Sequence, residues 1–272
     1  MQIYKVFLIY QKKRNKKSIV ILKPYKNQTM NLVIDTGNTR VKAAVFERSR
    51  LVELAVFSKK EIFKKLKEIK EKFKVVNSVI SSVADFSDEE RKKLDELLTP
   101  LFLNSETKIP FINRYETPKT LGVDRIALAA AAVDQYPGKN VLVIDAGTCI
   151  TYEFITKDKE YLGGGISPGI EMRYKALNKY TSKLPLKQAF QFEGLIGANT
   201  TDSIHSGVIN GVCNEIKGLI YEYKSKFEDL TVVLTGGDTK FLEEQLKSVI
   251  FAQPNFVLEG LYTILIYNLA NG

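Results

Sequence analysis

Apolar and polar residues follow two different periodicities along this chain. Short apolar runs, such as residues 32–35 and 75–81, predict buried β-strands, whereas residues 59–74 place apolar side chains three and four positions apart and predict an amphipathic helix. Strands and helices predicted in this way alternate from about residue 30 to the C-terminus. That alternation indicates the α/β fold class.

The expected elements fall into two successive sets. In the first set we expect strands at 32–35, 40–47, 51–57 and 75–81, and helices at 59–74, 88–98 and 123–133. In the second set we expect strands at 142–145, 149–155, 161–166, 230–235 and 249–251, and helices from 200 to about 227, from about 239, and at 259–270. A glycine-rich turn is expected at 163–169.

The two sets resemble copies of one unit. The sequence LVIDTG at residues 32–37 recurs as LVIDAG at residues 142–147, which is 110 residues later. In both copies an apolar strand ends in Asp-x-Gly and a second strand follows at once. Two such units in tandem predict two similar domains, residues 30–137 and 138–272, with a cleft between them. Residues 1–29 precede the repeat, and we expect them to form a dispensable extension.

The positive charge of the chain is concentrated in that extension. The 272 residues carry a net charge of +9, but residues 1–29 hold eight Lys and Arg residues and no acid, which leaves +1 for the rest. A basic surface for nucleic acid or membranes could therefore come only from residues 5–26. The chain has no apolar run long enough to cross a membrane, only two cysteines, and no convincing signal peptide. We expect a cytoplasmic protein that binds neither nucleic acid nor a membrane.

The first candidate site is the turn after the first strand, residues 35–42, with the sequence DTGNTRVK. Its glycine and short polar side chains let backbone N–H groups approach phosphate oxygens, Lys42 can lie along the phosphates, and Asp35 can hold Mg²⁺. The same residues could form an ordinary Gly-Asn hairpin turn. Recurrence of the turn as DAGT at 145–148 favours phosphate binding, because a purely structural hairpin would not repeat its aspartate.

Two further motifs have residues suited to binding or catalysis. In GVDR at 122–125, Asp124 could accept a proton from an attacking hydroxyl and Arg125 could clamp an anion, although a helix-start acid beside a solvated arginine fits the spacing equally well. The sequence TGGD at 235–238 would let an adenine or ribose lie against the backbone, or it could be a plain glycine turn. P-loop and Rossmann glycine motifs do not occur. The single histidine, His205, is expected on the polar side of its helix.

Taken in order, these motifs resemble those of type III pantothenate kinases, a family within the superfamily of acetate and sugar kinases, chaperone ATPases and actin. The matching segments are DTGNTRVK at 35–42, GVDR at 122–125, DAGT at 145–148, GGISPG at 164–169, NT at 199–200 and TGG at 235–237. The resemblance covers residues 30–272. It implies two tandem actin-like (ribonuclease H-like) domains with an interdomain cleft. It also implies a homodimer that uses ATP, Mg²⁺ and a monovalent cation, K⁺ or NH₄⁺, to phosphorylate pantothenate in the first step towards coenzyme A.

By position, the resemblance also implies roles for individual residues. The ATP-binding residues would be Asp35, Thr36, Gly37, Asn38, Thr39, Arg40, Val41, Lys42 and Thr148. The pantothenate-binding residues would be Tyr115, Gly122, Val123, Asp124, Arg125 and Thr200. Asp124 would be the general base, Asp35 would lie near Mg²⁺, and Asp145 would lie at the monovalent cation.

Three alternatives to a pantothenate kinase stay open on the sequence. One is a related small-molecule kinase acting on a sugar or acetate, and another is a non-catalytic accessory or regulatory protein on the same scaffold. The third is a nucleic-acid or membrane-surface binder that acts through residues 5–26. Tyr115 together with the GVDR motif favours pantothenate, and the presence of Asp35, Asp124 and Asp145 favours an enzyme. Thr200 could instead serve only as a helix N-cap.

Overall fold

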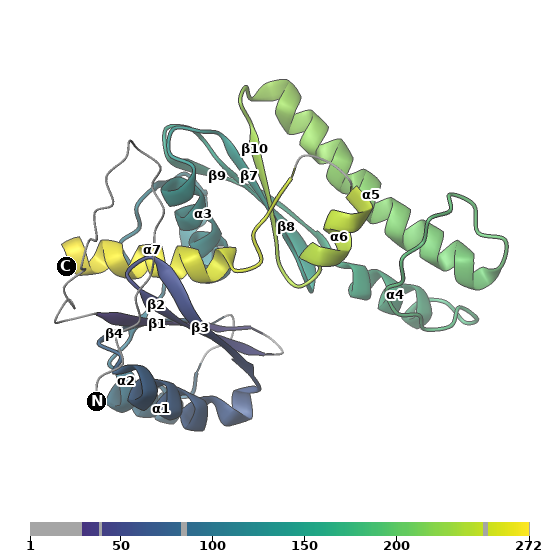
Figure 1. Ribbon diagram of the computed structural model, residues 1–272. Coiled ribbons are helices and arrows are strands. Elements are labelled where there is room, and N and C mark those ends of the chain that lie inside the picture. The colour runs from purple at the N-terminus through teal and green to yellow at the C-terminus, as the bar shows by residue number, and fades with distance from the viewer. Residues whose placement is uncertain (1–28, 38–39, 83–85, 247–249, 272) are drawn as a thin grey trace, which may run out of the picture.

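The computed structural model describes residues 29–37, 40–82, 86–246 and 250–271. It consists of two β-sheets with helices between them and on their outer faces (Figure 1). The extension before residue 29, together with Asn38 and Thr39 of the first candidate turn, lies outside the described residues.

The first sheet is built from the N-terminal part of the chain. Its elements are β1 (Met30–Thr36), β2 (Val41–Glu47), β3 (Arg50–Phe57), α1 (Ile62–Phe73), β4 (Asn77–Ser82), α2 (Asp88–Leu98) and β5 (Leu101–Phe102). The strand order is β3-β2-β1-β4-β5, in which β2 pairs antiparallel with β1 and β3, whereas β4 pairs parallel with β1 and β5. Apolar side chains of α1 and α2 cover one face of this sheet.

The second sheet repeats that order. Its elements are β6 (Ile112–Asn113), β7 (Val141–Ala146), β8 (Cys149–Ile155), β9 (Glu160–Pro168), α4 (Ile170–Lys179), α5 (Thr200–Lys226), β10 (Thr231–Thr235), α6 (Thr239–Leu246) and β11 (Phe251–Ala252). The strand order is β11-β10-β7-β8-β9-β6, so β7 is central, as β1 is in the first sheet. The α/β fold class and the internal duplication are therefore confirmed. Helices α4, α5 and α6 cover the outer face of this sheet.

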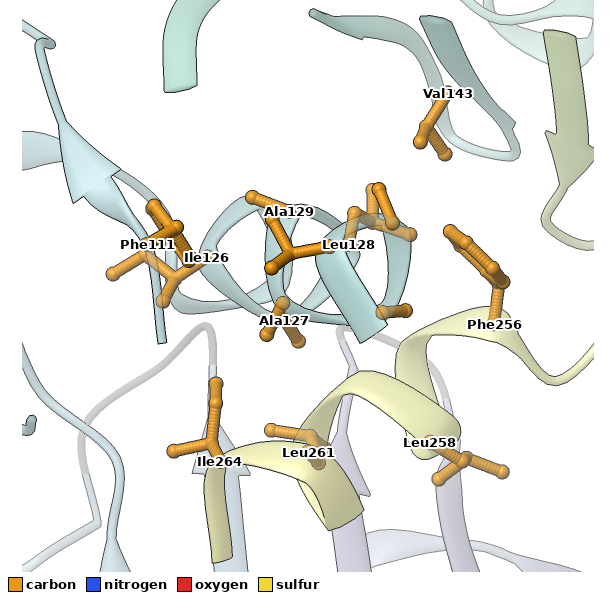
Figure 2. Close-up of a cluster of buried hydrophobic side chains, with 14 of the residues drawn as sticks. Phe111, Ile126, Ala127, Leu128, Ala129, Val143, Phe256, Leu258, Leu261 and Ile264 are labelled. Carbon is orange, nitrogen blue, oxygen red and sulfur yellow. The ribbon is translucent and has the colours of Figure 1, made fainter. Parts of the chain in front are cut away.

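Two helices lie between the sheets (Figure 1): α3 (Val123–Gln135) and α7 (Phe256–Asn271). They pack directly on each other, and the largest apolar cluster surrounds their contact (Figure 2). The backbones approach so closely that a Cβ at Gly260 of α7 would lie 1.8 Å from the carbonyl oxygen of Ala127 in α3. Small residues on α3 thus serve packing, because they let a second helix reach the same core.

Elements are exchanged between the two halves of the chain. Strand β6 precedes residue 138 but pairs with β9 in the second sheet, and the C-terminal helix α7 packs on β1 and β4 of the first. The proposed domain boundary between residues 137 and 138 therefore stays a prediction.

Two local expectations are wrong, and one helix was not expected. Residues 163–168 belong to strand β9 and not to a turn, and a Cβ at Gly164 would lie 1.6 Å from the carbonyl oxygen of Tyr152 on the neighbouring strand. Helix α4, with the sequence IEMRYKALNK, was not expected. His205 is 7% exposed, and its Nδ1 lies 2.8 Å from the Tyr174 hydroxyl oxygen, which is within hydrogen-bond distance. It is therefore not on the solvated side of α5.

Candidate active site

The two Asp-x-Gly motifs lie at equivalent strand ends of the two sheets. Asp35 is the penultimate residue of β1 and Asp145 that of β7. In the antiparallel register, Asp35 faces Lys42 on β2, whereas Asp145 faces Thr151 on β8. Each motif continues as a tight connection to the next strand, closed by the Gly37 N–H donating to Arg40 O at 3.1 Å and by the Gly147 N–H donating to Cys149 O at 2.9 Å.

Burial raises the pKa of Asp35 to about 6. The positive charge of Lys42 lowers this pKa, and so does a hydrogen bond from the Ser81 hydroxyl at 3.4 Å, whereas the charge of Asp124 raises it further. Burial and the charge of Asp124 outweigh Lys42 and Ser81, so Asp35 holds its proton more tightly than a solvated carboxyl group does.

Asp145 is perturbed in the same direction and by more. Burial raises its pKa to about 7, the charges of Asp124, Asp35 and Glu153 raise it as well, and Lys42 lowers it. The mutual influence of these charges means that side chains from β1, β2, β7 and the start of α3 converge on one region. Carboxyl groups with raised pKa values that lie close together are typical of functional sites.

Asp124 lies at the start of α3, where a carboxylate suits the positive end of the helix dipole. Its Oδ1 accepts a hydrogen bond from the Arg125 N–H at 2.9 Å. A Cβ at Gly122 would lie 2.5 Å from the same oxygen, so the glycine leaves room for the carboxylate. The half-buried carboxylate of Asp124 therefore has a defined orientation beside the two strand ends.

The sequence also allowed GVDR to be a helix-start acid beside a solvated arginine, but Arg125 is not solvated. It is 7% exposed, and its Nε donates to Glu153 Oε1 at 2.7 Å, while the Tyr161 hydroxyl donates to Glu153 Oε2 at 2.5 Å. Burial lowers the pKa of Arg125, but the hydrogen bond and charge of Glu153 raise it by more, so the guanidinium stays charged. The ring of Tyr115 lies beside it, with the Arg125 Cζ 5.4 Å from the ring centroid.

Sequence reasoning did not find Glu153 or Tyr161. One signal was present, since Glu153 is an isolated acid between aromatic residues in an otherwise apolar strand. An acid in such a strand requires a buried partner.

The remaining residues of the first turn and its counterpart have mixed environments. Thr36 and Val41 are buried, so their side chains support the turn from inside, whereas Arg40 and Thr148 are exposed. The Thr148 carbonyl accepts from the Gly169 N–H at 3.1 Å. In the TGGD segment, Gly236 has φ +97°, and a Cβ there would lie 2.3 Å from Asp145 Oδ1. Glycine is thus required next to this carboxylate.

The sequence model of the family described as "Type III pantothenate kinase" matches residues 31–222. The chain belongs to the type III pantothenate kinase family. A relative of that name from Christiangramia forsetii is 52% identical over 88% of this chain and 99% of its own, and one from Bacteroides fragilis is 46% identical over 88% and 98%.

Solved structures show the same fold at lower identity. A Baf family protein from Campylobacter jejuni is 23% identical with a TM-score of 0.60, and covers 88% of this chain and 99% of its own. A glucokinase from an Antarctic psychrotroph is 14% identical with a TM-score of 0.51, and covers 88% and 99%. The two-domain actin-like fold expected from the sequence is thereby confirmed.

In this type III pantothenate kinase family member, the expected site residue Thr200 is not brought to the acids Asp35, Asp124 and Asp145. Thr200 is the first residue of α5, and that end of α5 lies beside α4, on the opposite side of the second sheet from α3 (Figure 1). The helix is capped by Asn199, whose Oδ1 accepts from the Asp202 N–H at 3.0 Å. The alternative role of Thr200 as N-cap is therefore wrong.

The acids of the cluster suit an ion that takes few ligands from the protein. Across the residues that the structure describes, no three His, Cys, Asp or Glu side chains gather closely enough to enclose a metal ion. Mg²⁺ commonly binds one or two carboxylates and completes its shell with water and phosphate oxygens, so Asp35 fits such a site. No helix in the described parts of the chain is long and apolar enough to cross a membrane.

Proposed function

We propose that this protein transfers the γ-phosphoryl group of ATP to pantothenate and forms 4′-phosphopantothenate, the first step of coenzyme A synthesis. The observation that carries the proposal is the convergence of Asp35, Lys42, Asp124 and Asp145 in a chain of this family. Phosphoryl transfer needs positioning and charge neutralisation more than covalent catalysis, so acids, a lysine and cations suffice.

The turn at residues 35–42 holds the ATP phosphates, with Lys42 neutralising part of their charge and Asp35 holding Mg²⁺. Thr148, exposed on the equivalent turn of the second sheet, contacts ATP from the other side of the cleft. Asp35 would hold the divalent ion, which would supply positive charge to the phosphate groups. The exposed Arg40 and Thr148, and the glycines Gly37 and Gly147, support this arrangement.

Asp124 acts as the general base towards the hydroxyl group of pantothenate. A carboxylate is a weak base for an alcohol, so Asp124 orients the hydroxyl early and takes its proton late, when the new bond to phosphorus has largely formed. Its fixed orientation at the start of α3, next to Asp35 and Asp145, supports this role.

Pantothenate itself lies against the start of α3. Gly122 and Val123 give backbone contacts, Tyr115 supplies a ring, and Arg125 carries the positive charge that an acid requires. The half-buried Asp145, with a pKa raised to about 7, is suited to a monovalent cation, because a bound cation would relieve the unfavourable burial of its charge.

Thr200 reaches pantothenate only if a second copy of the chain supplies it, so we infer that the enzyme is a homodimer. The face of α5 with Gly207, Gly211 and Gly218 is exposed, and a Cβ at each would meet no atom within 4 Å. The connection before α5 exposes Leu195 and Ile196 by 78% and 84%. Large exposed apolar side chains next to a flat helix face support a protein–protein contact.

Mixed dimers test that inference. Asp124→Asn and Thr200→Ala chains, each inactive or weakly active alone, should regain about a quarter of the wild-type activity when refolded together, because one of two sites then combines two intact contributions. Mixing that restores no activity, or a monomer by light scattering, would contradict the shared site.

The main experiment is a phosphorylation assay with ATP and pantothenate, with and without K⁺ or NH₄⁺, on the full chain and on a truncation that begins at Met30. We expect phosphopantothenate from both proteins and stimulation by the monovalent cation. Asp124→Asn should fold normally and lose about 10²- to 10⁴-fold in kcat. Absence of product under every cation condition would overturn the assignment, and near-normal turnover by Asp124→Asn would overturn the general base. Cytoplasmic location stays a prediction.

A further inference from the structure

Two groups of the same three residue types lie on opposite faces of strand β8. On one face Glu153 binds Arg125 and Tyr161, and on the other Glu215 of α5 binds Arg173 and Tyr152. The first group is the more enclosed, since the side chains of Arg125 and Glu153 are 8% and 0% exposed, against 22% and 26% for Arg173 and Glu215. Only the first group adjoins the cluster of acids.

Glu153 holds the guanidinium of Arg125 through the Nε atom of the arginine. The Nε of Arg125 donates to Glu153 Oε1 at 2.7 Å, and the second carboxylate oxygen is fixed by the Tyr161 hydroxyl at 2.5 Å. Glu153 and Tyr161 both lie on strands of the second sheet, whereas Arg125 itself lies on α3. The carboxylate therefore decides where an α3 side chain lies relative to the sheet.

Aromatic rings restrict the guanidinium further. The Tyr115 ring centroid lies 5.4 Å from Arg125 Cζ and 6.2 Å from the Tyr161 ring centroid. A Cβ at Gly163, which has φ +103°, would lie 3.2 Å from Tyr115 Cδ2, so this ring is in turn packed on β9. With its Nε bound to Glu153 and a hydrogen bond to Tyr115, the guanidinium still has further N–H donors that are suited to a second carboxylate.

We propose that Glu153, fixed by Tyr161, is a positioning residue that orients Arg125 for the carboxylate of the substrate, and so makes the site selective for an acid over its neutral analogues. This inference rests on the proposed pantothenate kinase function. Glu153 touches Arg125 and does not touch the reacting atoms. Its contribution is geometric, because an arginine that can choose among several rotamers binds a carboxylate less well than one already held in place.

Variants that keep the charge of the pair test the geometry alone. Glu153→Asp retains the negative charge but withdraws the carboxylate by one methylene, and Tyr161→Phe leaves both charges and removes one hydrogen bond. We expect the KM for pantothenate to rise about tenfold in Glu153→Asp and about threefold in Tyr161→Phe, while the KM for ATP stays within about twofold of wild type.

The second group supplies matched controls. Glu215→Asp and Tyr152→Phe make the same chemical changes on the other face of β8, and we expect neither to alter the KM for pantothenate. A second substrate sharpens the assay: the alcohol analogue of pantothenate, in which a hydroxymethyl group replaces the carboxylate. Wild type should prefer the acid, and Glu153→Asp should narrow that preference about tenfold by losing kcat/KM for the acid alone.

The outcomes are distinct. If Glu153→Asp and Tyr161→Phe lower kcat/KM for the acid and the alcohol equally, Glu153 is structural and the inference is wrong, while the kinase function stands. If Glu153→Asp does not fold, Tyr161→Phe decides the question by the same ratio. If the wild-type protein phosphorylates neither compound, the proposed function fails and the inference fails with it.

Discussion

The two halves of this protein repeat a backbone but not its charges. Strands β1 and β7 occupy the centres of their sheets, and each ends in an aspartate at the same point of the repeat. The residue opposite differs, since Lys42 faces Asp35 and Thr151 faces Asp145. One lysine thus acts on both carboxylates, and it lies directly opposite only the first.

After burial, the charge of Lys42 has the largest influence on the pKa of Asp35, whereas the charge of Asp124 has the largest influence on the pKa of Asp145. The pKa of Asp35 is raised to about 6 and that of Asp145 to about 7. Lys42 lies directly opposite Asp35, whereas the residue opposite Asp145 is the uncharged Thr151, so a bound cation would relieve more unfavourable charge at Asp145 than at Asp35. A duplicated fold can therefore divide phosphate binding and cation binding between two copies of one turn.

Substitution of the first acid should have the largest effect. We expect Asp35→Asn to lower kcat about 10²- to 10³-fold, because a carboxylate that holds the divalent ion contributes mainly to the charged transition state. A coupled assay at saturating ATP and Mg²⁺ measures this. Asp158→Asn, exposed in the turn before β9, is the control. A greater loss in Asp145→Asn than in Asp35→Asn would contradict the division of roles.

The pH dependence of stability should distinguish the two acids next. The pKa of Asp145 is raised from 3.8 to about 7, so between these values the folded protein holds a proton that the unfolded chain has released, and stability falls as pH rises through this range. Asp145→Asn should therefore be more stable than wild type at pH 8, by on the order of 2–4 kcal/mol, and close to it below about pH 4.

Urea unfolding in buffers without K⁺ or Mg²⁺ measures that difference. Asp35→Asn should show the same trend over a narrower range, because the pKa of Asp35 is raised only to about 6. Greater stabilisation by Asp35→Asn, or a stabilisation by Asp145→Asn that does not change with pH, would show that the contrast in burial and charge is wrong.

The glycine beside Asp145 should be sensitive to substitution. Gly236 has φ +97°, and a Cβ there would lie 2.2 Å from the Ala146 carbonyl oxygen, so Gly236→Ala should cost about 2–3 kcal/mol of unfolding free energy. Gly147→Ala is the control, because a Cβ there meets no atom within 4 Å, and it should change stability by less than about 1 kcal/mol. Equal losses in chemical denaturation would contradict the close packing on Asp145.

The smallest effect should come from making the halves alike. Thr151→Lys places a lysine opposite Asp145, as Lys42 lies opposite Asp35. We expect the ratio of activity with and without K⁺ to fall about threefold or more, because the new ammonium group replaces the bound ion. The measurement is a K⁺ titration at fixed Na⁺ or choline, with Thr156→Lys on the same hairpin as the control. Unchanged K⁺ activation would indicate that the ion does not lie at Asp145.

Much of the local structure could be predicted from the sequence. Helix α2 begins and ends where its apolar spacing and its acidic first turn place it, and β8 likewise matches the expected strand. The glycine-rich turn failed for a definite reason: glycine suggests a turn by its backbone freedom, but Gly164 is glycine because the neighbouring strand leaves no space for a side chain. Crowding by a distant strand has no local sequence signature.

The candidate site was found only in part. Asp35, Asp124 and Asp145 were identified from turns and a helix start, which are local features. Glu153 and Tyr161 were missed, because their importance depends on Arg125, which approaches them from another element. The burial of His205 was missed as well, since it packs against Tyr174 of α4, a helix that was not expected.

The sequence by itself determined the two copies of the strand–Asp–turn unit, most of the strands and helices around them, and the acids that each copy presents, because periodicity and turn chemistry depend on near neighbours in the chain. It did not predict β5, β6 or α4. Only the tertiary structure decided that Asp124 raises the proton affinity of both strand-end acids, that Glu153 holds Arg125, that α7 returns to the first sheet, and that the start of α5 lies on the other side of the second sheet from α3. Burial, charge coupling and side-chain pairing depend on segments far apart in sequence.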